Sequence, residues 1–270
     1  MNCLKNIETV SRFNCSILRE DRLWEGFSEN RFQKRMMKGT YMKKIGLVGG
    51  TGPESTLMYY KELNSRIDKI TDGKQMPEIV IESLDFRRAW DYVSSGKYDL
   101  LKDYLSEKVR CLKKAGAEVI SLTAVTMHIV FEELVKDTGV SLISIPKAVC
   151  KEVKNKGYNK ILLLGTIFTM EQDYMKNDFK DAGIEVYIPD ENDRNLVAKR
   201  IFEELELGIV KENTLKEFQS IIDKMRDQCG IEAVVLGCTE LPLLLNSKNC
   251  SVPCLDSVEI HINDLIHEAL

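Results

Sequence analysis

The sequence predicts an α/β fold: two pseudo-symmetric, doubly wound α/β domains with parallel-rich sheets, and a ligand site in the cleft between them. Short apolar runs typical of buried strands alternate with amphipathic segments typical of helices, which is the pattern of parallel sheets joined by right-handed crossovers. Two strand-and-turn segments also recur, since 45–56 resembles 161–171 and 118–128 resembles 233–242. The two offsets are nearly equal, which indicates a duplicated unit of about 110 residues.

Each expected strand is a short apolar run that ends near a glycine, a hydroxyl residue or a proline, and each expected helix has apolar residues at helical spacing. The expected strands are 45–48, 78–83, 119–122, 141–145, 161–164, 185–188, 233–236 and 252–255. The expected helices are 54–69, 100–115, 130–136, 147–156, 171–182, 193–206, 214–228 and 258–269. Pro53 fits the first position of the first helix, because the missing N–H is not needed there.

The repeat predicts where the domains begin and end. Residues 42–144 together with 257–270 are expected to form the first α/β domain, and 145–256 the second. Residues 1–41 are expected to be an N-terminal extension, because their apolar residues are scattered and Met42 stands just before the first strand. An amphipathic helix that docks on the body is the alternative for this segment.

Composition excludes several classes of protein. The 270 residues are 44% hydrophobic and 30% charged with a net charge of −4, so neither a basic nucleic-acid-binding face nor a membrane span is expected. The eight cysteines form no CxxC pair and there are only three histidines, so no metal site is expected. This cysteine usage fits a reducing compartment and predicts a cytoplasmic protein.

Cys238 is the most informative single residue. It follows the strand 233–236 and one glycine, so its thiol is expected at the carboxyl end of a strand, where open α/β sheets bind ligands. A helical segment is expected to begin just after it, and the helix dipole would lower the pKa of the thiol. Thr239 and Glu240 are expected to contact the substrate, although Glu240 alternatively only adds charge to the helix start. A buried structural cysteine is the alternative for Cys238 itself.

The turn that matches Cys238 in the first half carries no thiol. Ala124 stands at the corresponding position, and Ala124 and Val125 are expected to line the substrate. Acid–base or hydroxyl chemistry for the other face of the substrate is expected from Thr123, Thr126 and His128. His128 alternatively caps the helix that follows.

The glycine-rich turn after the first strand is expected to bind a small carboxylate. Gly50, Thr51 and Gly52 precede a helix start, where backbone N–H groups attract anions. The spacing matches neither the GxGxxG fingerprint nor the P-loop, so a nucleotide is not expected. A tight turn without a ligand is the alternative.

Two further groups are candidates for holding anions. Thr166 and Thr169 follow the strand 161–164 and are expected to form a second pocket, although one of them alternatively only caps a helix. Arg87 follows the strand 78–83 and is expected to reach a substrate carboxylate, which a guanidinium holds bidentately. Paired arginines on a solvated helix start are the alternative for Arg87 and Arg88.

Together these segments resemble the aspartate/glutamate racemase family over about residues 42–270. The residues that carry the resemblance are Gly49-Gly50-Thr51-Gly52-Pro53-Glu54-Ser55-Thr56, Leu122-Thr123-Ala124-Val125-Thr126-Met127-His128, Leu164-Gly165-Thr166 and Gly237-Cys238-Thr239-Glu240-Leu241-Pro242. The resemblance implies two acid/base groups that face each other across the substrate α-carbon, with Cys238 as one of them. It also implies that Ala124 replaces the first catalytic Cys or Thr of the family.

The resemblance implies an amino-acid racemase that works without pyridoxal phosphate or any other cofactor, acts on aspartate or glutamate, and forms a homodimer. Cys238 would then move the α-proton on one face of the substrate. Because the second thiol is missing, two alternatives stay open. One is a one-thiol decarboxylase of a malonate-like diacid, which needs a single protonation, and the other is a catalytically impaired ligand-binding relative.

Overall fold

A computed structural model describes residues 41–270, and Tyr41–Leu270 forms one compact unit. The predicted extension 1–41 therefore lies outside the described residues, except for Tyr41.

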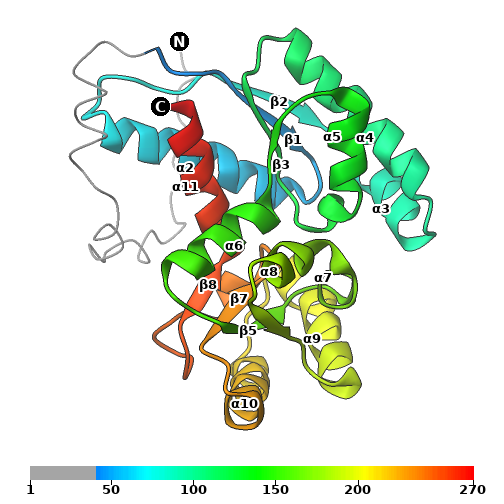
Figure 1. The fold of residues 1–270 in the computed structure, drawn as a ribbon, viewed down its shortest axis with the longest axis vertical. Coiled ribbons are helices and arrows are strands. Elements are labelled where there is room, and N and C mark those ends of the chain that lie inside the picture. Colours follow the sequence, from blue (N-terminus) through cyan, green and yellow to red (C-terminus); the bar gives the residue numbers. More distant parts are fainter. Residues whose placement is uncertain (1–40) are drawn as a thin grey trace, which may run out of the picture. The chain divides into compact units, whose positions relative to one another are not determined.

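The described residues hold two parallel sheets of four strands each (Figure 1). The first has the order β2-β1-β3-β4 and consists of β1 (Ile45–Gly49), β2 (Ile79–Ser83), β3 (Val119–Leu122) and β4 (Leu142–Ile143). The second has the order β6-β5-β7-β8 and consists of β5 (Lys160–Leu164), β6 (Glu185–Tyr187), β7 (Ala233–Leu236) and β8 (Cys254–Asp256). Counted from its own first strand, each sheet has the same order, so the predicted fold class is confirmed.

Helices connect the strands, as parallel pairing requires. The α-helices are α2 (Pro53–Ile70), α3 (Phe86–Ser94), α4 (Tyr98–Lys114), α5 (Phe131–Thr138), α6 (Ile145–Asn155), α7 (Ile167–Glu171), α8 (Asn177–Asp181), α9 (Glu191–Glu203), α10 (Glu212–Cys229) and α11 (Ser257–Ala269). The 3₁₀ helices are η1 (Thr126–Val130), η2 (Asp173–Met175), η3 (Leu205–Leu207) and η4 (Leu241–Leu243).

The predicted single helix over 171–182 is wrong. The chain instead forms α7, η2 and α8, because Gln172 adopts an extended conformation with ψ of 158°. The Lys176 ammonium donates to the carbonyl oxygens of Met170 and Glu171, at 3.3 and 2.8 Å, and so stabilises the interrupted end of α7. This break lets Tyr174 project from a short 3₁₀ turn.

The central strands are buried on both faces. Every residue of β1, β3 and β7 is buried, which explains their near-continuous apolar sequence. The apolar side of α11 packs with β1 and α2 in one cluster, and Ser257 at its start donates to the Leu236 carbonyl oxygen at 2.7 Å. Thus α11 touches elements of both sheets, and the predicted domain boundaries stay a prediction.

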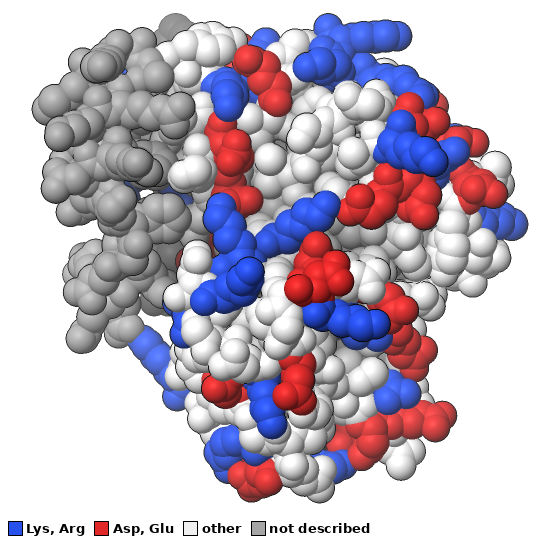
Figure 2. Space-filling model, in the orientation of Figure 1, with Lys and Arg blue, Asp and Glu red and all other residues white. Residues whose placement is uncertain are grey.

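The surface carries charges of both signs. On the face shown in Figure 2, basic and acidic side chains lie next to one another rather than in separate fields. None of the helices in the described part of the chain is both long enough and apolar enough to cross a membrane.

Candidate active site

Cys238 lies two residues beyond the end of β7 and is 7% exposed. Its thiol donates a hydrogen bond to Glu240 Oε2, with a sulfur–oxygen distance of 2.9 Å. Gly237 before it and Gly165 after β5 permit a close approach, because a Cβ on either glycine would meet the side chain of Thr169 within 3 Å. The thiol, the Glu240 carboxylate and Thr169 therefore share one strand-end region.

The expectation of a lowered thiol pKa is wrong. Only the three-residue turn η4 follows Cys238, so few peptide dipoles are aligned toward the sulfur. Burial raises the pKa of the Cys238 thiol well above its usual value, and the negative charges of Glu240 and Glu206 raise this pKa further. The thiol is therefore protonated at neutral pH and donates a hydrogen bond to the Glu240 carboxylate.

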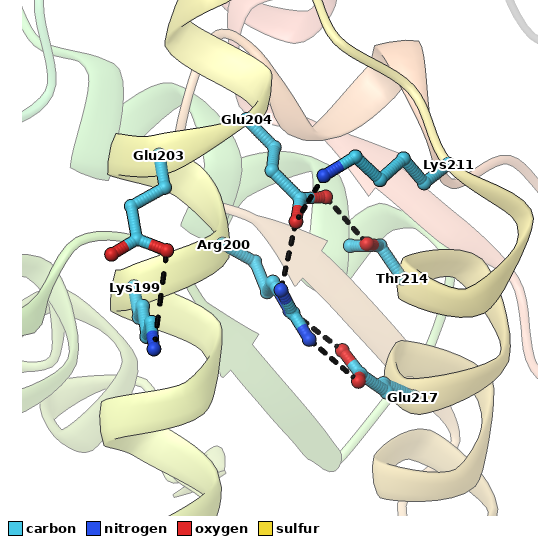
Figure 3. A network of polar contacts seen from close by, with 7 residues as sticks. All are labelled: Lys199, Arg200, Glu203, Glu204, Lys211, Thr214 and Glu217. Carbon is cyan, nitrogen blue, oxygen red and sulfur yellow. Dashed lines mark hydrogen bonds and ion pairs between the residues drawn. The ribbon is translucent and has the colours of Figure 1, made fainter.

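A network of ion pairs stabilises the segment that carries Glu206. Arg200 of α9 binds Glu217 of α10 through two contacts of 2.8 Å and also binds Glu204 at 2.8 Å (Figure 3). Glu204 is 2% exposed and further accepts hydrogen bonds from Lys211 and Thr214 (Figure 3). The buried carboxylate is thus fully compensated and joins α9 to α10 just before η3.

The turn after β3 corresponds to the Cys238 turn in the other sheet. Ala124 lies two residues beyond the end of β3, as Cys238 does for β7, and it is half-buried. Thr123 is fully buried and its hydroxyl donates to the Val48 carbonyl oxygen at 3.2 Å. Val125 packs in the apolar cluster around β5 and α6. The structure therefore gives Thr123 and Val125 packing partners in the protein, and their substrate contacts stay a prediction.

His128 connects two pieces of backbone. Its Nδ1 donates to the Ala124 carbonyl oxygen at 3.0 Å, and its Nε2 accepts from the Ile145 N–H at 3.1 Å. Burial lowers the pKa of His128 to about 3, so the ring is neutral. This geometry favours the structural alternative, and the catalytic role of His128 stays a prediction.

Three hydroxyl groups form a hydrogen-bonded chain. Thr166 Oγ1 lies 3.1 Å from Thr169 Oγ1, which lies 3.0 Å from the Tyr174 hydroxyl. The turn η2 that carries Tyr174 also packs against η1, which begins at Thr126. Thr166 in addition caps α7 by accepting from the Thr169 N–H at 3.3 Å, as the capping alternative predicts.

Sequence reasoning missed Tyr174. Burial raises the pKa of its phenol, and its hydroxyl bonds to Thr169, which packs against Gly237 next to Cys238. The sequence offered a weak signal, a tyrosine five residues beyond Thr169, but the predicted helix over 171–182 hid it.

The glycine-rich turn has one polar group without a partner. Thr51 is 8% exposed and its buried Oγ1 makes no hydrogen bond within the described residues. Gly50 has φ of 82°, and a Cβ there would lie 2.6 Å from backbone atoms of Leu84, so only glycine fits. The N-cap of α2 is Gly52, which supplies no side chain to the helix start. Thr51 and the start of α2 are thus available to a small anion.

The two arginines are placed differently. Arg87 is exposed in the first turn of α3, where Asp85 accepts hydrogen bonds from the N–H groups of Arg87 and Arg88. The Arg88 guanidinium stacks 4.3 Å from the centre of the Tyr104 ring and donates to the Tyr92 hydroxyl. Arg88 is therefore engaged within its own half, and substrate contact by Arg87 stays a prediction.

Other features of the described residues add no second site. Residues 41–270 contain no group of three or more His, Cys, Asp or Glu side chains placed to hold a metal ion. A surface pocket of about 500 Å³ lies between α9 and α10, lined by Asp193, Leu196, Asn213, Lys216, Glu217, Ser220 and Ile221, and it includes none of the predicted site residues.

Comparison with known proteins agrees with the fold. The family model for Asp/Glu/hydantoin racemases matches residues 48–265. A crystal structure of a candidate Asp/Glu racemase from Yersinia pestis is 36% identical, with a TM-score of 0.80, and covers 84% of this chain and 99% of its own. PH1733, an aspartate racemase homologue from Pyrococcus horikoshii, is 38% identical with a TM-score of 0.75 over the same shares. The broad specificity amino-acid racemase RacX of Bacillus subtilis is 23% identical over 79% of this chain and 92% of its own length.

The matched region contains both sheets, the glycine-rich turn and the Cys238 turn. The chain therefore belongs to the Asp/Glu/hydantoin racemase family and is an isomerase of the amino-acid racemase type.

Proposed function

We propose that this protein racemises a small acidic amino acid, aspartate or glutamate, and that Cys238 moves the α-proton on one face. The observation that carries the proposal is the hydrogen bond from the Cys238 thiol to Glu240 at the end of β7. Loss of the thiol proton to solvent leaves a thiolate, which takes the proton from Cα while the electron pair stays on the substrate. Glu240 acts through the thiol and is a positioning residue.

The substrate carboxylate has a candidate binding place in the first half. The unpartnered Thr51 hydroxyl and the start of α2 offer hydrogen-bond donors to an anion. Donors that are fixed before the substrate arrives stabilise the negative charge that builds up when Cα loses its proton. Thr239, half-buried beside Cys238, is proposed to contact the same substrate from the other half.

The test is isotope uptake from heavy water. The protein is incubated in D₂O with each enantiomer of aspartate and of glutamate, and deuterium at Cα and the enantiomeric ratio are followed by NMR and chiral chromatography. The proposal predicts racemisation of at least one pair, with deuterium in the product. Absence of both exchange and racemisation for all four compounds would contradict it.

One observation favours a second candidate, a one-thiol decarboxylase of a malonate-like diacid. The protonated Cys238 thiol is ready to donate one proton to the carbanion that remains after carbon dioxide leaves, and Ala124 supplies no second group. Carbon dioxide release from substituted malonates, without racemisation of amino acids, would select this function over the first.

Assembly and location complete the proposal. We infer a cytoplasmic location, in keeping with the free thiols of Cys111, Cys150, Cys229, Cys238, Cys250 and Cys254. We also infer that the protein is a homodimer. Light scattering on the purified protein should give twice the mass of 30.9 kDa. A mass of one chain would contradict the dimer and leave the proposed chemistry unaffected.

A further inference from the structure

The two sheets place Ala124 and Cys238 at corresponding positions. Strands β3 and β7 each lie third in the sheet order, and each residue follows its strand end by two positions. One position carries a thiol and the other a methyl group. Because inversion at Cα needs a proton donor on the face opposite the base, the Ala124 side of the site must obtain a donor from elsewhere.

Tyr174 reaches that side. The turn η2 that carries Tyr174 packs against η1, which begins at Thr126, two residues beyond Ala124. The Tyr174 hydroxyl lies 3.0 Å from Thr169 Oγ1. Tyr174 comes from η2, an element separate from the β7 turn that carries Cys238. A phenol therefore approaches the turn that lacks a thiol.

Contacts through Thr169 connect the phenol to the Cys238 region. The Cγ2 atom of Thr169 lies 2.9 Å from the position that a Cβ on Gly237 would take, so Thr169 packs directly against the residue before Cys238. The Tyr174 phenol and the Cys238 thiol thus both carry an exchangeable proton, and they border one site from different elements.

The hydroxyl chain gives the phenol a route to regain its proton. Tyr174 bonds to Thr169, and Thr169 bonds to Thr166, which is half-buried rather than enclosed. Each hydroxyl can accept one proton while it donates another. A proton lost by Tyr174 can therefore be replaced along Thr166 and Thr169.

We propose that the Tyr174 hydroxyl carries the proton on the face opposite Cys238, in place of the missing thiol at position 124. This inference rests on the proposed racemase function. In one direction the Cys238 thiolate takes the α-proton, so that the Cα–H bond breaks and an S–H bond forms. The electron pair on Cα then takes the proton of the Tyr174 O–H group, which leaves a tyrosinate that accepts a hydrogen bond from Thr169.

The two directions are unequal. Burial keeps Tyr174 protonated, which suits it as a donor and disfavours the tyrosinate needed to deprotonate the other enantiomer. Deuterium should therefore enter from one enantiomer faster than from the other.

The test is Tyr174→Phe, which removes one oxygen and keeps the ring. Racemisation should fall at least about 100-fold, the usual minimum contribution of a general acid. Cys238 should still remove and return a proton on its own face, so one enantiomer should take up deuterium with retention of configuration. Tyr158 packs against the same apolar cluster, and Tyr158→Phe is the matched control that should racemise like the wild type.

A second variant separates proton transfer from a purely structural role. Ala124→Cys in the Tyr174→Phe background places a thiol at the position corresponding to Cys238. The double variant should racemise at least about tenfold faster than Tyr174→Phe alone. Equal racemisation in the wild type and Tyr174→Phe would overturn the inference while the function stands. If Tyr174→Phe lost both racemisation and the deuterium exchange with retention of configuration, and Ala124→Cys restored neither, Tyr174 would have a structural role only and the inference would be overturned. A wild type without any exchange would instead defeat the proposed function.

Discussion

Two buried neutral histidines should make this fold sensitive to mild acid. His128 bonds to the backbone on both sides of its ring, and His261 lies 2.7 Å from the Tyr59 hydroxyl and 2.9 Å from Ser121 Oγ. Burial lowers the pKa of His128 from 6.5 to about 3 and that of His261 from 6.5 to about 4. Below pH 6.5 the unfolded chain binds a proton at each ring, whereas the folded chain does not until pH 4 or 3.

The size of the effect follows from proton linkage. At pH 5, about 1.5 pH units below the unfolded pKa, each histidine should cost about 2 kcal/mol of folding free energy. Asp256 acts in the opposite direction, because burial raises its pKa from 3.8 to about 6 and the folded state then binds the proton more tightly. It should return about 1.4 kcal/mol at pH 5. The net loss between pH 7 and pH 5 is therefore about 2.5 kcal/mol.

Urea unfolding at pH 7 and pH 5, followed by circular dichroism, measures this difference. His128→Gln keeps a donor and an acceptor but does not titrate, so the pH-dependent loss should shrink by about 2 kcal/mol, whatever the stability at pH 7. His267→Gln is the control, since 47% of that side chain is exposed. Unchanged pH dependence in His128→Gln would refute the assignment of a neutral, buried ring.

Three further outcomes follow from single contacts. Glu240→Gln removes the charge 2.9 Å from the Cys238 sulfur, so alkylation of this thiol by iodoacetamide at pH 8, followed by mass spectrometry, should accelerate on the order of tenfold; an equal or slower rate would contradict the contact. Gly50→Ala should lower the free energy of unfolding by about 2 kcal/mol or more. Gly73→Ala is the control, because Gly73 also has a positive φ, of 72°, but a Cβ there would meet nothing within 4 Å, so its loss should be clearly smaller. Equal losses in urea unfolding would contradict the crowding at Leu84. Asp85→Ala should cost about 1 kcal/mol in the same assay, because Asp85 caps α3 by accepting from two N–H groups; no loss would contradict that cap.

Much of the fold was predictable from local sequence. The strands β1, β3, β5 and β7 are short apolar runs with clear turn residues after them, and burial on both faces is what such runs require. The near-equal spacing of the two pairs of segments also predicted two like sheets. Helix α3 was missed, although Asp85 is a residue type that commonly caps helices and was available as a signal.

The site was less predictable because its decisive contacts are not local. The break after α7 depends on Lys176 reaching back to carbonyl groups, which apolar spacing does not reveal. Tyr174 lies in η2, which packs against η1 although the two turns are far apart in the sequence, so no motif records this arrangement. The pKa of Cys238 depends on where the Glu240 side chain points and on burial, and residue spacing alone indicated the wrong direction.

The central claim is that Cys238 moves the substrate α-proton. Its most direct test compares Cα deuterium uptake from D₂O by the wild type, Cys238→Ala and Cys150→Ala, on whichever of aspartate or glutamate the wild type exchanges. Cys150 is a matched control, since it is 6% exposed against 7% for Cys238 and also bonds through its thiol. We predict wild-type exchange in Cys150→Ala and a loss of at least about 100-fold in Cys238→Ala. Undiminished exchange in Cys238→Ala would contradict the account.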